Sequence, residues 1–84
     1  MTPTQRAELG TRRCRYRFRF REVLELNGHT LSSLADELGV SAPAVSRTIR
    51  GKLHSTKVLD WFKDKGLSEK YLCDPRTAER AEPA

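Results

Sequence analysis

Apolar residues recur three and four positions apart along most of the chain, which is the spacing of one face of an α-helix. The clearest case is a pair of neighbouring segments. Leu31, Leu34 and Leu38 form one apolar stripe in the first segment, and Val45 and Ile49 form another in the second. Each segment therefore predicts a short helix with one face to bury.

Small residues between these two segments predict how the helices pack. Helices that cross steeply through a short turn need a small residue where they touch and a glycine where the chain turns, and Ala35 and Gly39 stand at these two places. Thr30 and Ser41 are positioned to cap the two helices. The sequence therefore predicts a helix-turn-helix, with its second helix at about residues 42–50.

The segment before this pair has two interpretations. The apolar residues at helical spacing are Phe20, Val23, Leu24 and Leu26. They predict a helix over residues 18–27, which Asn27 and Gly28 are suited to end. However, aromatic residues and arginines alternate with a period of two just before it, and a short strand over residues 15–20, pairing with its copy in a dimer, is the alternative. We favour the helix.

Two further helices are predicted after the pair. Ser55 is placed to cap a helix that Gly66 stops, and Ser68 begins a short helical turn. The apolar residues that these helices offer to the core are Val58, Leu59, Trp61, Phe62, Tyr71 and Leu72. The predicted fold is all-α: a compact four- to five-helix bundle over residues 18–73, with a basic flexible arm at 1–17 and a disordered tail at 74–84.

Length and charge limit what this bundle can do. A chain of 84 residues forms one domain with a small core and leaves no room for a pocket that binds a small-molecule effector. The formal net charge is +5, with +6 in residues 1–21 and +4 in residues 46–57, while the other segments are slightly acidic. Positive charge gathered in two segments indicates a polyanionic partner, since solubility is served equally well by mixed signs.

The run LADELGVSAPAVSRTIRGK resembles the helix-turn-helix of the lambda repressor and Cro-like superfamily. Within it, AVSRTIRGK, followed by Ser55, Val58 and a closing LSEKYLCDPR, is similar to small Ner-like regulators of transposable phages and their bacterial relatives. The resemblance spans Phe20 to Arg76. It implies a sequence-specific, double-stranded-DNA-binding transcriptional regulator of phage or prophage type, expected to be a repressor that acts as a homodimer.

In this geometry the second helix of the motif reads base edges in the major groove, while its end and the next loop meet phosphates. The candidate base contacts are Ser41, Ala42, Ala44, Ser46 and Arg47. The candidate backbone contacts are Arg50, Lys52, His54, Ser55, Thr56 and Lys57. The arginines proposed for the minor groove, reached by the flexible arm, are Arg12, Arg13 and Arg15.

Other classes of function lack a signal in the sequence. No paired carboxylates, activated nucleophile or metal-ligand spacing is present, so we expect no enzyme, no catalytic residue, no metal and no cofactor. Cys14 and Cys73 are expected to be reduced thiols of a cytoplasmic, nucleoid-associated protein, and no segment suits a signal peptide or a membrane span. The alternative function is a protein-interaction module that binds a recombinase, a polymerase subunit or a phage partner.

Overall fold

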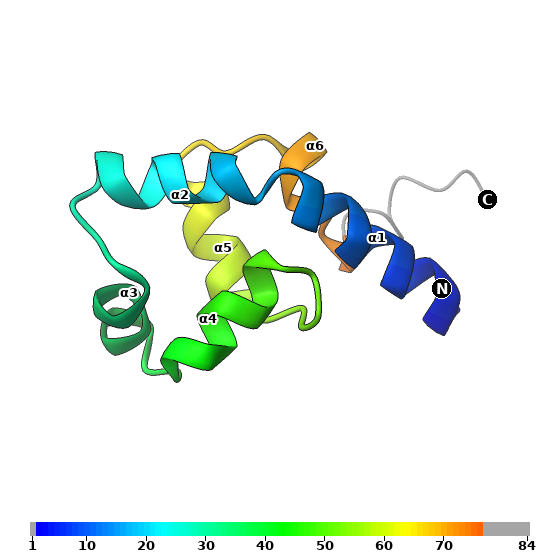
Figure 1. Cartoon of the computed structure of the whole chain (residues 1–84), viewed down its shortest axis with the longest axis horizontal. Coiled ribbons are helices and arrows are strands. Elements are labelled where there is room, and N and C mark those ends of the chain that lie inside the picture. Colours follow the sequence, from blue (N-terminus) through cyan, green and yellow to red (C-terminus); the bar gives the residue numbers. More distant parts are fainter. Residues whose placement is uncertain (1, 77–84) are drawn as a thin grey trace.

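The computed structural model describes residues 2–76, and this part of the chain forms six helices and no strand. In chain order the helices are α1 (Pro3–Arg15), α2 (Arg17–Leu26), α3 (Leu31–Leu38), α4 (Ala42–Ile49), α5 (Thr56–Asp64) and α6 (Glu69–Leu72), as Figure 1 shows. The predicted all-α class is confirmed, and the helix predicted over residues 18–27 is present in place of the alternative strand. The count exceeds the four to five helices predicted, because α1 was not expected.

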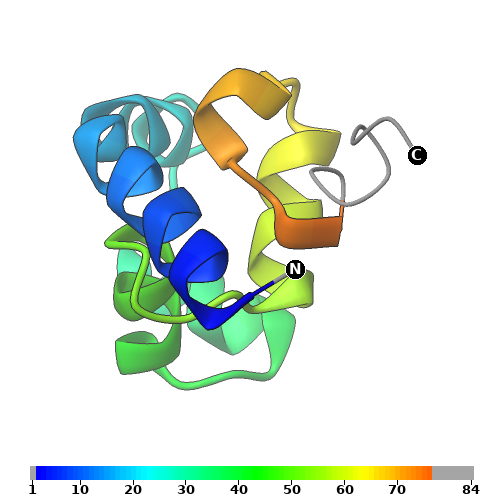
Figure 2. The same cartoon turned by 90° about the vertical axis from the view of Figure 1, so that its right-hand side faces the viewer.

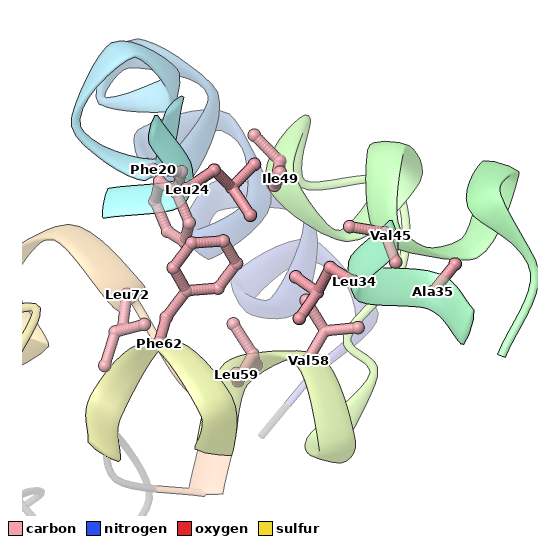
Figure 3. Close-up of a cluster of buried hydrophobic side chains, with 10 residues drawn as sticks. All are labelled: Phe20, Leu24, Leu34, Ala35, Val45, Ile49, Val58, Leu59, Phe62 and Leu72. Carbon is pink, nitrogen blue, oxygen red and sulfur yellow. The ribbon is translucent and has the colours of Figure 1, made fainter. Parts of the chain in front are cut away.

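The hydrophobic core lies where α2, α3, α4 and α5 meet, and the end of α6 closes it (Figure 3). Its buried residues are Phe20, Leu24, Leu34, Ala35, Val45, Ile49, Val58, Leu59, Phe62 and Leu72. The rings of Phe20 and Phe62 meet edge to face with their centroids 4.8 Å apart. Leu26, which we placed near this stripe, is 84% exposed, because it lies 200° around the helix from Leu24.

The connection between α3 and α4 has the predicted chemistry. Thr30 and Ser33 form a reciprocal capping box at the start of α3, and the Ser41 hydroxyl accepts a hydrogen bond from the Ala44 amide at the start of α4. Gly39 ends α3 in the left-handed region at φ 70°, where a side chain is disfavoured. Ala35 is buried in the core. Three residues therefore suffice to turn the chain from α3 into α4.

The segment predicted as a flexible arm, residues 1–17, is instead helix α1 over most of its length. Thr2 and Gln5 form a capping box, Pro3 occupies the first turn, and Tyr16 is the single residue that separates α1 from α2. Figure 2 looks along α1 and shows it between α6 and the loop after α4. The helix packs there through Gly10, which lies against the backbone of Gly51. Such a contact places α1 beside the end of α4.

Residues 74–76, predicted to belong to the tail, are instead packed on the bundle. Asp74 and Pro75 are buried, and one Asp74 carboxylate oxygen accepts a hydrogen bond from the Arg76 amide at 2.9 Å. The Arg76 guanidinium also donates to Asp60 of α5 at 2.6 Å. These contacts attach residues 74–76 to the bundle. The rest of the predicted tail, residues 77–84, lies outside the described residues.

Candidate nucleic-acid interface

Helix α4 buries one side and presents the other to solvent. Val45, Thr48 and Ile49 are buried, and the Thr48 hydroxyl is satisfied by donating to the Ala44 carbonyl at 2.8 Å. The remaining positions of the helix and its caps are exposed at Ser41, Pro43, Arg47 and Arg50 and half-buried at Ala42, Ala44 and Ser46. Apart from Arg47 and Arg50, the side chains on this outward side are small, so another surface can approach the backbone of α4 closely.

Two arginines of α2 join this surface. A hollow between α2, α3 and α4 is lined by Arg17, Arg21, Leu31, Ser46, Ile49 and Arg50. Arg17 and Arg21 are one helical turn apart, and the Arg17 guanidinium is held by the Cys14 carbonyl at 2.9 Å. Neither arginine was among the sequence-based candidates, although their i, i+4 spacing was a signal that they share a face.

The loop after α4 adds further positive charge at the end of the helix. The amides of Lys52 and Leu53 donate to the Arg47 carbonyl at 2.9 and 3.3 Å, which folds this loop back over the last turn. Arg50 and Lys52 therefore stand near the helix C-terminus, where the helix dipole favours cations. They also line a second hollow, together with Ala7, Gly10, Thr11, Cys14, Gly51 and His54. Neither of the two hollows has an acidic residue in its lining.

Within the described region these cations have no carboxylate partner, a property that they share with Lys57, Lys65 and Lys70. Within residues 2–76, no ion pair involves Arg17, Arg21, Arg47, Arg50 or Lys52. By contrast, Arg19, Lys63 and Arg76 each lie within 4.0 Å of a carboxylate. We refer to the five unpaired cations as the α4 cationic surface. Its charge is not neutralised by the described part of the protein.

The other candidates for backbone contact do not all reach this surface. Lys57 is exposed in the first turn of α5, and Ser55 caps that helix by position only, with no side-chain hydrogen bond. Thr56 borders a separate hollow shared with Asp74 and Arg76. Arg50 and Lys52 therefore line the same hollow beside α4, whereas Thr56 lines a different one.

Arg13, predicted to reach a minor groove, is completely buried, which corrects that assignment. All of its guanidinium nitrogens donate hydrogen bonds inside the protein. The acceptors are the carbonyls of Leu72 (2.6 Å), Thr48 (2.9 Å), Leu53 (3.0 Å) and Cys73 (3.0 Å) and the Nδ1 atom of His54 (2.8 Å). Burial lowers the pKa of Arg13, and Cys73 and Asp74 oppose that shift. Arg13 thus joins α1 to the ends of α4 and α6.

The two other arginines predicted for the minor groove, Arg12 and Arg15, are exposed but lie elsewhere on α1. Arg12 and Arg15 line a groove between α1 and α6, together with Leu9, Tyr16, Glu69, Lys70, Cys73 and Asp74. Two acidic residues thus share this groove, unlike the hollows beside α4. The structure does not bring Arg12 or Arg15 to the α4 cationic surface.

His54, predicted as a phosphate contact, is half-buried: it lines the hollow beside Arg50 and Lys52, while its ring is bound to Arg13. Its Nδ1 accepts from Arg13, which assigns the ring proton of the neutral imidazole to Nε2. Burial and the neighbouring charges of Arg13 and Arg6 lower the pKa of His54. Protonation would place a second N–H against the Arg13 guanidinium.

This pKa shift predicts a loss of stability in mild acid. Below about pH 6.5 the unfolded chain binds a proton at residue 54 before the folded chain does, so the stability present at neutral pH falls as the pH falls. Urea unfolding at pH 7.5 and pH 5.5 measures the difference. His54→Asn is the matched control, because its amide oxygen can accept from Arg13 without titrating. An equal pH dependence in the variant would contradict this explanation.

The remaining chemistry of the described residues is limited. Cys14 is half-buried and Cys73 is buried, and both are free thiols. Within residues 2–76, no three His, Cys, Asp or Glu side chains gather in a way that would hold a metal ion. None of the helices in the described region has both the length and the apolar character that crossing a bilayer requires.

No protein-family model, curated protein or solved structure matches this chain. The interpretation of the α4 cationic surface therefore rests on the chemistry and geometry of its own residues.

Proposed function

We propose that this protein is a sequence-specific DNA-binding transcriptional regulator, a repressor of phage type, in which α3 and α4 act as a helix-turn-helix. One observation carries the proposal: α4 is an uncovered helix with small outward side chains, flanked by cations without acidic partners. A helix of this kind fits the major groove of B-form DNA, and the cations fit the phosphates on either side.

The roles within α4 follow from position. Arg47 is exposed and, like guanidinium groups that read guanine, has a planar pair of donors available. Ser41 and Ser46 offer hydroxyl groups, although Ser41 already caps the helix, and Ala42 and Ala44 offer methyl groups to thymine. These five residues are our proposed base contacts. We assign no catalytic step to the chain.

The phosphate contacts are proposed for four cations that border the hollows beside α4, namely Arg17, Arg21, Arg50 and Lys52. Phosphate contacts fix the register of a protein on DNA but carry no sequence information. Lys57 extends this set along the start of α5. Because the small side chains of α4 make few hydrogen bonds, we propose that a homodimer or the deformability of the operator supplies the rest of the specificity.

The test begins with selection of preferred duplexes from a random library, followed by fluorescence anisotropy on the selected duplex and on a scrambled one. Arg47→Ala is expected to weaken binding to the selected duplex by about 5- to 100-fold, since a bidentate base contact contributes ~1–3 kcal/mol. Binding to the scrambled duplex should change much less. If Arg47→Ala leaves affinity for the selected duplex within about twofold, the assignment of Arg47 fails.

The salt dependence tests the phosphate contacts separately. Four contacts predict a slope of log K against log salt of about −3.6, or a loss on the order of 100-fold between 50 and 200 mM salt. Arg50→Ala should weaken both duplexes alike and reduce the slope by about 1. Lys65→Ala, at the C-terminal end of α5, is the matched control and should leave both values unchanged. Absence of any DNA binding at low salt would favour the protein-interaction alternative.

A further inference from the structure

Helix α1 and the loop after α4 form the two walls of a hollow of about 550 Å³. One wall consists of Ala7, Gly10, Thr11 and Cys14, and the other of Arg50, Gly51, Lys52 and His54. The walls meet at the two glycines, where a Cβ atom on Gly10 would lie 2.0 Å from the Gly51 carbonyl oxygen. Figure 2 shows α1 beside this loop. The hollow therefore includes a helix to which the proposed function gives no role.

The hollow carries positive charge and has no carboxylate in its lining. Arg50 and Lys52 are exposed, and neither lies within 4.0 Å of a carboxylate of residues 2–76. The buried Arg13 guanidinium adds a third cation beneath the surface, because it donates to His54 at 2.8 Å and has no ion pair among the same residues. Cations gathered in this way attract an anionic ligand.

The hollow adjoins the one beside α2, since Arg50 lines both. Its α1 wall is formed by small side chains, with Ala7 and Thr11 exposed and Cys14 half-buried. The Thr11 hydroxyl is already bound to the Ala7 carbonyl at 3.0 Å. Cations line only the loop wall, so a free anion would be held from one side alone. A polyanion bound at Arg17 and Arg21 would instead continue past Arg50 into this hollow.

We propose that this hollow receives a phosphodiester segment of the same DNA duplex that α4 contacts, so that α1 is part of the DNA interface. The inference rests on the proposed function and extends it to a further helix. Arg50 and Lys52 supply the charge, and the small side chains of Ala7 and Thr11 let the phosphates approach α1. One DNA strand then runs from α2 across Arg50 to α1.

Charge placed at residue 11 tests the proposal. This residue is exposed within α1 and lines the hollow, and both glutamate and lysine suit a helix. Fluorescence anisotropy on the scrambled duplex at 50 mM salt is the measurement, because phosphate contacts carry no sequence information. Thr11→Glu should weaken binding about fivefold or more, through repulsion of the phosphates. Thr11→Lys should strengthen binding and make the slope of log K against log salt steeper by about 1.

These opposite effects separate charge from lost space, because both side chains are larger than threonine. Arg12→Gln is the matched control: it lowers the net charge by one, as Thr11→Glu does, but it alters the groove between α1 and α6. It should change the affinity by less than about twofold, since salt screens distant charges. Thermal melting of each variant establishes that it is folded.

Three results would overturn the role of α1: unchanged binding by Thr11→Glu, weaker binding by Thr11→Lys, or an equal loss in Arg12→Gln. If any of these occurs while Arg50→Ala still weakens binding, the proposed function stands and only its extension to α1 is wrong. If the wild-type chain binds no duplex at 50 mM salt, both proposals are wrong.

Discussion

Arg13→Met is expected to lower the free energy of unfolding by about 3–5 kcal/mol, the largest effect of any single substitution that we anticipate. Methionine fills a similar volume, but it removes the donor from the carbonyls of Leu53, Leu72 and Cys73 and from the His54 ring nitrogen, while the Thr48 carbonyl keeps only the Gly51 amide. Removing one partner from a buried, charged hydrogen-bond network typically has a cost of this size. For a domain of this length the melting temperature should fall by on the order of 20 °C.

Two further variants isolate the cause of this effect. Arg12→Met, at the adjacent exposed position, should change the free energy of unfolding by less than about 0.5 kcal/mol. Arg13→Lys retains the positive charge but donates from a single nitrogen, so it should show an intermediate loss. Urea denaturation followed by circular dichroism measures all three. A melting temperature for Arg13→Met close to that of the wild type would refute the assigned network.

Gly51→Ala is expected to cost about 2–4 kcal/mol, through two separate causes. The residue has φ 81°, which a residue with a Cβ atom adopts at a cost of ~1–2 kcal/mol. In addition, a Cβ atom built there would lie 1.8 Å from the Gly10 carbonyl oxygen, so that α1 and the loop must move apart. The same urea denaturation experiment gives the difference from the wild type.

Gly28→Ala provides the matched control for this prediction. Gly28 has φ 69°, but nothing lies within 4 Å of the Cβ position, so only the conformational cost applies. Gly10→Ala tests the contact from the other side, since its Cβ atom would lie 2.0 Å from the Gly51 carbonyl oxygen and its φ is not positive. If Gly51→Ala and Gly28→Ala lose equal stability, the backbone contact contributes nothing.

The helices that the sequence predicted are those held by apolar side chains. Leu34, Val45 and Phe62 bury one face of α3, α4 and α5, and such faces repeat at a spacing that can be counted along the chain. The caps at Thr30 and Ser41 then fix where α3 and α4 begin. For these elements the local pattern and the tertiary packing agree, which is why the boundaries were close to those found.

Helix α1 was missed because its packing uses a different chemistry. Its buried residues are Gly10 and Arg13, neither of which contributes to an apolar stripe. The contact between Gly10 and Gly51 and the acceptors around Arg13 are formed by residues distant in sequence, and neither can be read from local spacing. A signal was nevertheless present, since Thr2, Pro3 and Gln5 have the pattern of a capped helix start.

The residues of the candidate site also divide into those that local spacing could identify and those that only tertiary packing brings together. The exposed positions of α4, including Arg47 and Arg50, could be chosen from the sequence because they alternate with its buried face. Arg17 and Arg21 join them only because α2 packs beside α4. Arg13 is of a residue type that contacts nucleic acids, but carbonyls at the ends of α4 and α6 accept its hydrogen bonds inside the protein, and His54 accepts another.

The partners of Arg13 also impose an order on biosynthesis. Its hydrogen bonds to Leu72 and Cys73 span 59 and 60 residues, so they cannot form while the later part of the chain is still inside the ribosome. During translation α1 emerges before α6, so the hydrogen bonds from Arg13 to Thr48 and Leu53 can form before those to Leu72 and Cys73. A nascent chain that ends before residue 72 therefore lacks the hydrogen bonds by which Arg13 holds the end of α6.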